Sequence, residues 1–336
     1  MKSLRKVLYI FLLLGMLACN NKVDINSEYQ DISIVYGLLN QSQSRQFVKI
    51  TKAFQTEGNV HNATKDSSLS QYQIGDLEVY IDEYGNGNFM RTIDLDTFLV
   101  TDKDSGEFYY PNQIVYATPP NTHLDENHEY KLVVNIKSLD KTLKASTELI
   151  HDFSILKPNS GQKYVSFASR LPQTVEWRSA VNGKLYQLII RFFYTEKDAS
   201  GNLSSHHIDI PLNTKVSQTT QGGEKLKDEF YGDIFYQTVA AKVPQPEAGM
   251  VRYADSVFYI FSVADENFYI YMDLNKPSSS VVQERPSYSN IENGVGIFAG
   301  RYNKMRKFLG LATRSLDTLI DGQYTRNLGF DRYPIP

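Results

Sequence analysis

Residues 130–136 read Tyr-Lys-Leu-Val-Val-Asn-Ile, with Tyr130, Leu132, Val134 and Ile136 at every second position. Successive side chains of a β-strand point to opposite faces, so this spacing predicts a strand with one buried face. Residues 144–149 predict a second strand that returns beside it. Short strands of this kind, separated by turn residues, are typical of a β-sandwich.

The same pattern extends toward the N-terminus. Residues 32–39 and 46–53 predict two strands joined by a polar turn. Leu77, Val79 and Ile81 alternate before residues 84–88, where Tyr-Gly-Asn-Gly-Asn is a strong β-hairpin signal. The polar residues 56–71 predict a long loop.

Downstream, the strand pattern lapses at residues 156–161, where Pro158 and Gly161 predict a domain boundary. Beyond it, Trp177 lies in a predicted strand and is expected in a core. Residues 184–195 predict a long apolar strand, which a turn at residues 198–202 joins to another strand at residues 205–211.

One helix is predicted in this second half, over residues 226–239, because apolar side chains recur there at three to five positions. Pro244 follows its expected end. Residues 256–264 and 267–274 are rich in aromatic side chains and predict two strands separated by Asp265-Glu266. Residues 158–336 are therefore expected to form a second β-rich domain with at least one helix.

The N-terminus has the layout of an export signal. Lys2, Arg5 and Lys6 precede an apolar run of about eleven residues, and the small Ala18 stands directly before Cys19. The run is shorter than the roughly 20 residues of a membrane-spanning helix. This N-terminal layout predicts a lipoprotein signal peptide over residues 1–18, with palmitate or a similar acyl chain on Cys19. Residues 19–28 are expected to form a tether between the lipid and the folded body. An ordinary cleaved signal with an incidental cysteine is the alternative.

Cysteine count and charge restrict the remaining possibilities. Cys19 is the only cysteine, so no intrachain disulfide can form and packing must stabilise the fold. Removal of residues 1–18 leaves 32 basic and 38 acidic side chains, a net charge of −6. This acidity argues against nucleic acid as a partner and against electrostatic binding to anionic lipids.

Sequence motifs assign no catalytic, cofactor-binding or metal-binding residue. There is no Gly-x-Ser-x-Gly elbow, His-Glu-x-x-His, phosphate-binding glycine loop or dinucleotide fingerprint. Residues 102–107 and 196–201 resemble the start of a calcium loop, but their Asp, Ser and Gly are equally typical of hairpin turns.

The histidines also lack a metal-binding spacing. His206 and His207 are adjacent in a predicted strand, so they point to opposite faces. His123 and His128 flank a predicted loop. We expect solvent-exposed histidines rather than a zinc site, which needs three or four convergent ligands.

Residues 284–302 contain Ser289-Asn290-Ile291 followed by Asn293-Gly294-Val295-Gly296-Ile297-Phe298. This segment resembles the C-terminal signature of an uncharacterised family of Bacteroidota outer-membrane lipoproteins. The resemblance implies an immunoglobulin-like β-sandwich over residues 29–157 and a second β-rich domain that closes on this segment. Family members are often encoded beside TonB-dependent receptors, and no catalytic residues are known. From the residues alone, the segment predicts a closing turn and strand in which Gly296 permits close backbone approach.

Together these observations predict a non-catalytic lipoprotein anchored to the outer membrane through Cys19, with its body on either face. Its expected role is a binding or accessory component of a TonB-dependent nutrient-uptake system, without a cofactor. Two alternatives remain from the sequence: a structural surface protein such as a fimbrial or adhesin subunit, and an unrecognised hydrolase.

Overall fold

The computed structural model describes residues 31–54, 60–106, 109–168, 171–276 and 288–334, which form a mainly β structure, as predicted. The predicted signal peptide, Cys19 and the whole predicted tether lie outside these residues. Among the described residues, no helix has the length and apolar character needed to cross a membrane.

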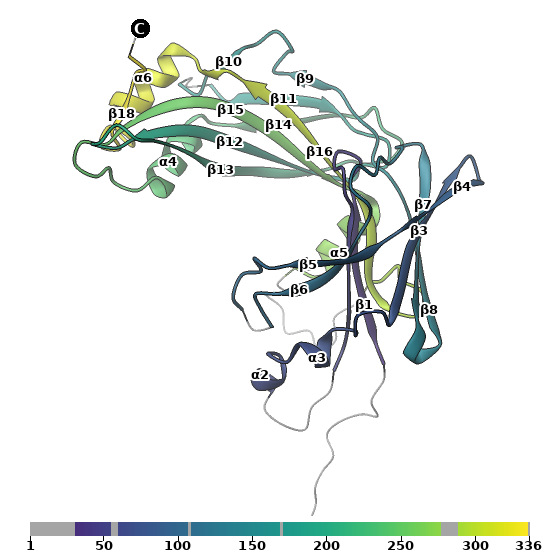
Figure 1. Ribbon diagram of the computed structural model, residues 1–336. Helices are drawn as coiled ribbons and strands as arrows, with labels where there is room; N and C mark the ends of the chain where they lie inside the picture. The colour runs from purple at the N-terminus through teal and green to yellow at the C-terminus, as the bar shows by residue number, and fades with distance from the viewer. Residues whose placement is uncertain (1–30, 55–59, 107–108, 169–170, 277–287, 335–336) are drawn as a thin grey trace, which may run out of the picture.

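The largest sheet has nine strands and contains residues from both ends of the described chain (Figure 1). Its order is β13 (Leu203–Val216), β12 (Leu185–Lys197), β15 (Val251–Ala264), β16 (Val295–Phe308), β1 (Ser33–Leu39), β2 (Phe47–Lys52), β6 (Gln113–Ala117) and β5 (Asp96–Val100), with β18 (Phe330–Asp331) beside β15. The strands predicted over residues 32–39, 46–53 and 184–195 are therefore confirmed.

A four-stranded antiparallel sheet packs against one end of the large sheet. Its order is β4 (Asn88–Asp94), β3 (Leu77–Gly85), β7 (His128–Ile136) and β8 (Lys141–Glu148). The predicted hairpin joins β3 to β4, and both Asn86 and Gly87 have positive φ there. Tyr130, Leu132 and Val134 are buried, because the alternation of β7 directs them between the two sheets.

We call the apolar residues enclosed there the N-terminal core. Its members are Val35, Leu39, Val48, Ile50, Tyr72, Leu77, Val79, Ile81, Ile93, Leu95, Tyr116, Leu124, Tyr130, Leu132, Val134, Ile136, Leu143, Ala145, Leu149, Ile291 and Phe298. Two of them, Ile291 and Phe298, come from the C-terminal part of the chain.

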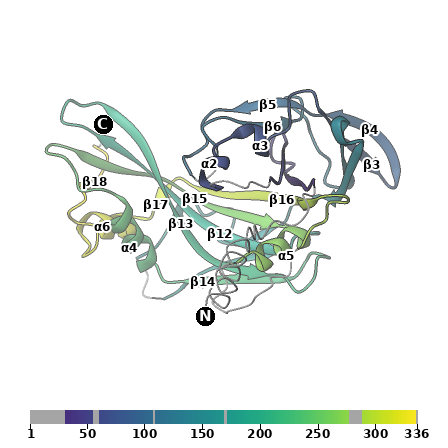
Figure 2. The ribbon, with the colours of Figure 1, turned by 90° about the horizontal axis from the view of Figure 1, so that it is seen from below.

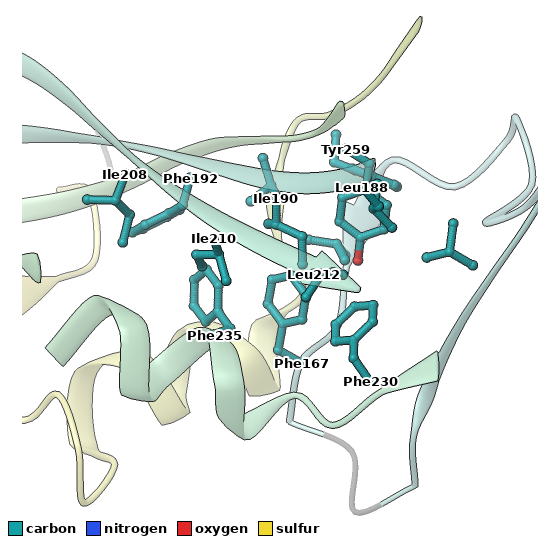
Figure 3. Packing of buried hydrophobic residues seen from close by; sticks show 14 of the residues in the cluster. Phe167, Leu188, Ile190, Phe192, Ile208, Ile210, Leu212, Phe230, Phe235 and Tyr259 are labelled. Carbon is teal, nitrogen blue, oxygen red and sulfur yellow. The ribbon is translucent and has the colours of Figure 1, made fainter. Parts of the chain in front are cut away.

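The C-terminal core lies on one face of β12, β13 and β15 (Figure 3). It is covered by α4 (Asp233–Lys242) and α6 (Thr313–Asp321), by the sheet of β14 (Lys225–Phe230), β11 (Gln173–Arg178) and β9 (Ile155–Lys157), and by the pair β10 (Tyr164–Val165) and β17 (Gly310–Leu311). Phe235 of α4 stacks on Phe167 with ring centroids 4.4 Å apart. Trp177 is 1% exposed, which confirms its predicted core position.

Strand β16 contributes to both cores, with Phe298 in the N-terminal core and Phe308 in the C-terminal core. Figure 1 shows it running from the upper sheet down beside β1. Its first half pairs in parallel with β1, from Ile34–Val295 to Leu39–Gly300, and its second half pairs antiparallel with β15. The sheet is therefore continuous across the predicted boundary between residues 157 and 158, and the boundary itself stays a prediction.

Gly296 makes this pairing possible. Its φ is +120°, and a Cβ atom built there would lie 2.0 Å from the carbonyl oxygen of Val35. Only glycine avoids such an overlap. Asn290 fixes the preceding loop, because its side chain accepts a hydrogen bond from Phe298 N (2.9 Å) and donates one to Phe298 O (2.7 Å). The predicted close backbone approach at Gly296 is confirmed.

Three local predictions were wrong. The helix predicted over residues 226–239 is two elements, because β14 extends along β11 through residue 230 and α4 begins only at Asp233. Residues 267–274 lie in α5 (Glu266–Leu274) instead of a strand, because Asp265 caps the helix by accepting from Phe268 N. The loop predicted over residues 56–71 contains α2 (Val60–Ala63) and α3 (Ser67–Ser70).

Candidate functional site

A cavity of about 420 Å³ lies on the face of β1, β2 and β6 that points away from the N-terminal core. Ligand pockets commonly measure about 300–1,000 Å³. Its described lining residues are Ile34, Tyr36, Lys49, Thr51, Lys52, Ala53, Phe54, Ser70, Gln71, Lys103, Tyr109, Gln113 and Ile114. The alternation of side chains along β1 and β2 explains which residues line the cavity. Val35, Val48 and Ile50 point into the core. Their neighbours Ile34, Lys49 and Thr51 therefore point into the cavity.

Lys103 and Tyr109, between β5 and β6, line one side of the cavity. The amide of Lys103 donates to the carbonyl of Pro111 at 3.2 Å, and its ammonium donates to the carbonyl of Tyr109 at 2.6 Å. Tyr109 in turn donates its amide to the carbonyl of Thr64, beside α3 (2.9 Å). Figure 2 shows α2 and α3 in the same part of the molecule as β5 and β6 when seen from below, and the Tyr109–Thr64 hydrogen bond joins the chain between β5 and β6 to the chain between the two short helices.

The lining carries three lysines and no described acidic residue. Lys103 is held by the Tyr109 carbonyl, and the Lys52 ammonium lies 5.7 Å from the ring centroid of Tyr72. Lys49 is half-buried and forms no hydrogen bond or ion pair with any residue that the structure describes. Burial and repulsion from Lys103 hold the pKa of Lys49 below its usual value.

A second polar group in the cavity also lacks a partner. The Gln113 Oε1 atom is buried and accepts no hydrogen bond from the described residues. Buried polar atoms are rarely unpaired, and each such atom costs free energy unless something bonds to it. Lys49 thus offers a donor to a bound molecule, whereas the Gln113 oxygen is an unpaired acceptor buried beside the cavity.

Neither residue was singled out from the sequence. A lysine in an alternating strand is indistinguishable from any solvent-facing lysine until the covering segment is placed over it. Lys103 lies within the predicted turn at residues 102–107, which the structure confirms to be irregular where it is described. The only sequence signal was the lack of an acidic residue from position 45 through 56, beside Arg45, Lys49 and Lys52.

None of the histidines considered as metal ligands lines this cavity. His206 stacks on Tyr194 and His207 contacts Phe193, so the two histidines point to opposite faces, as predicted. His123 is exposed, as expected. His128 differs, because β7 places it beside β3, where its Nδ1 lies 2.7 Å from the buried carboxylate of Glu83.

Glu83 has enough partners to be a structural group. Arg91 (2.5 Å), His128 and the Tyr130 hydroxyl (2.9 Å) all contact its carboxylate. Burial opposes ionisation of Glu83, but its hydrogen bonds outweigh burial and hold its pKa below the usual value. The cluster fastens β3 and β4 to the loop before β7, since Arg91 also bonds the His123 carbonyl at 2.7 Å.

Two further groups bear on the hydrolase alternative. Ser204 Oγ lies 2.9 Å from His206 Nε2, but Glu196 approaches the same Nε2 atom at 3.2 Å. In a catalytic triad the carboxylate bonds the other ring nitrogen. Glu196 is also paired with the buried Arg252 at 2.8 Å. The arrangement is that of an ion pair across a hairpin.

Asp265 lies in a polar cleft with Glu129, Glu148 and Glu266. Burial raises the pKa of Asp265 to about 6. Its oxygens accept from the amides of Gly300 (2.6 Å) and Phe268 (2.8 Å), and Thr147 Oγ1 lies at 3.2 Å. These partners give Asp265 a structural role as the joint between β8, α5 and β16.

The predicted calcium-like segment at residues 196–201 is a hairpin turn, in which Asp198 accepts from the amide and side chain of Asn202. Among the described residues, no three His, Cys, Asp or Glu side chains group closely enough to hold a metal ion. Comparison with family models and with curated proteins finds no match for this chain.

Proposed function

We propose that this chain is a non-catalytic binding protein, anchored to the outer membrane through lipid on Cys19, that serves a TonB-dependent nutrient-uptake system. The cavity over β1, β2 and β6 is its binding site for a small molecule. The protein passes that molecule to, or holds it beside, the receptor that transports it.

The half-buried ammonium of Lys49, which has no ion-pair partner among the residues that the structure describes, carries this proposal. Partial burial and repulsion from Lys103 both disfavour the charged form of Lys49, so an anionic partner in the cavity would stabilise it. The cavity volume of about 420 Å³ suits a small molecule.

The position of the cavity fits an anchored protein. The described chain begins at Asp31, next to Ile34 of the cavity wall, and the Ile32 carbonyl accepts from the amide of Ala53 on the same wall (2.8 Å). A tether over residues 19–28, fully extended, reaches roughly 33 Å at about 3.3 Å per residue. The cavity would therefore lie at the anchored end of the molecule.

Capture of partners from detergent-solubilised outer membranes tests this proposal, with the lipidated protein as bait. We expect a TonB-dependent receptor to co-purify. The Cys19→Ala variant serves as the control, because it should fold normally and yet leave the membrane fraction. Recovery of the lipidated protein without a receptor partner would refute the role in uptake.

The two alternative functions, a structural surface protein and a hydrolase, predict different results for the same purified protein. A fimbrial or adhesin subunit should form polymers whose length grows with concentration, through strands exchanged between copies. An unrecognised hydrolase should consume a substrate. Neither result is expected of a binding protein.

A further inference from the structure

We propose that the cavity binds small organic anions in which one anionic head, a carboxylate or a phosphate monoester, is joined to a flat apolar body. This inference rests on the proposed function, because it takes the cavity to be a binding site and names the chemical class of its ligand.

The head group is indicated by charge. Lys49, Lys52 and Lys103 line the cavity, and no acidic side chain among its described lining residues neutralises them. Repulsion between Lys49 and Lys103 is already felt in the unbound site. An anion between the two ammonium groups would replace this repulsion by two attractions, and partial burial would strengthen both.

The body is indicated by the remaining walls. Ile34 of β1 and Ile114 of β6 supply aliphatic surface, and Phe54 and Tyr109 supply aromatic rings. Pockets of this kind gain most of their affinity from apolar contact, and a few polar groups fix the orientation of the ligand. The Lys49 ammonium is one such group.

Other ligand classes match the site less well. A free inorganic anion would satisfy the lysines but leave the apolar walls against water. A neutral sugar could bond to Lys49 but would leave the charges of the lysines unneutralised, and a cation would meet three like charges. A macromolecule would need an open surface, whereas Lys103, Tyr109 and helix α3 flank this cavity.

A matched series of naphthalene compounds tests the assignment, using the complete mature chain with Cys19→Ala and isothermal titration calorimetry. The probes are 2-naphthoate, 2-naphthyl phosphate, neutral 2-naphthol and inorganic phosphate. We expect at least one aryl anion to bind at least tenfold more tightly than 2-naphthol and than inorganic phosphate. Tenfold corresponds to 1.4 kcal/mol. Comparison of the two aryl anions identifies the preferred head group.

Two variants locate the binding. Lys49→Met should weaken binding of the preferred aryl anion at least tenfold and leave 2-naphthol binding unchanged. Lys307→Met is the matched control, because Lys307 is exposed on β16 and contacts only the ring of Phe258, outside the cavity. It should bind every probe like the parent chain.

Three outcomes would overturn the inference. Equal affinity for 2-naphthol and both aryl anions would refute the anion class and leave the cavity as a binding site. Equal losses in Lys49→Met and Lys307→Met would place the binding outside the cavity. If no probe binds although a receptor co-purifies with the lipidated protein, the ligand class is wrong and the proposed role in uptake stands.

Discussion

The two cores of this protein differ in where their residues come from. Every member of the C-terminal core lies between Ile150 and Phe330, so this core is made by one continuous part of the chain. The N-terminal core is formed by residues 35–149 only in part, because Ile291 and Phe298 complete it. One core is self-contained, and the other depends on a strand that arrives from the far end of the sequence.

Their packing differs accordingly. Aromatic rings contact one another throughout the C-terminal core, as where Phe235 stacks on Phe167 and Trp177 meets Phe261 at 5.3 Å. In the N-terminal core, the critical contact is between backbones, at Gly296 and Val35. The C-terminal core should therefore tolerate local changes, whereas the N-terminal core should fail when β16 is disturbed.

The largest effect is expected from Gly296→Ala. The new Cβ atom would overlap the Val35 carbonyl at 2.0 Å, and φ of +120° would strain the alanine backbone. We expect a loss of more than about 4 kcal/mol in unfolding free energy, as for other severe steric changes. Hydrogen exchange should show loss of protection in β7 before β12.

Gly106→Ala is the control for this substitution, since a Cβ atom there meets nothing within 4 Å. Its unfolding free energy should match that of the parent chain within about 0.5 kcal/mol. Equal losses in the two variants would contradict the role of the Gly296–Val35 contact.

Phe298→Ala should have the next largest effect. Phe298 is fully buried in the N-terminal core, and phenylalanine truncation in a core costs about 3–5 kcal/mol. Phe308→Ala is the matched variant, because Phe308 lies on the same strand but packs in the C-terminal core. Hydrogen exchange should rise mainly in β3 and β7 for the first variant and mainly in β12 and β15 for the second. The same exchange pattern in both would break the comparison between the cores.

Asp265→Asn tests the joint between the two regions. Burial raises the pKa of Asp265 to about 6, so the folded state holds a proton that the unfolded state releases between about pH 4 and 6. This group therefore contributes stability at low pH that is lost as the pH rises through 6. The parent chain should lose up to about 3 kcal/mol more than Asp265→Asn between pH 4 and 7. Urea denaturation at both pH values measures the difference, and a constant difference would contradict the assignment.

The smallest effect is a gain. Lys49→Met removes a half-buried cation beside Lys103 that has no ion-pair partner among the described residues, so the ligand-free variant should be slightly more stable than the parent chain. Thermal unfolding at pH 7 measures this change, with Lys307→Met as the neutral reference. A loss of stability in Lys49→Met would contradict this prediction, because it would show that the Lys49 side chain stabilises the folded protein.

The strands in which apolar and polar side chains alternate could be predicted from the sequence, because burial of one face of a strand places an apolar residue at every second position. Sequence reasoning placed Trp177 in a core and Gly296 at a close approach for the same local reasons. It assigned residues 267–274 to a strand because Phe268, Tyr269 and Tyr271 favour strands, and it read Asp265 as a turn residue instead of a helix cap.

The pairing of distant strands and the cavity could not be predicted, because they depend on contacts between segments far apart in the sequence. Pairing of β1 with β16 joins segments about 260 residues apart, and no periodicity in either strand indicates its partner. The cavity likewise forms only when the segment carrying Lys103 folds over Lys49. Such features follow from tertiary packing, which single-sequence patterns do not encode.

Pairing of β1 with β16 also sets the order of events as the chain is made. Synthesis proceeds from the N-terminus, so β1 exists long before residues 295–300 are added. Until then, one edge of β1 has unpaired amides and carbonyls, and unpaired edges promote association with other chains. The edge of β1 therefore stays open until these residues are added, and a nonsense codon anywhere before residue 295 would leave the nine-stranded sheet unfinished.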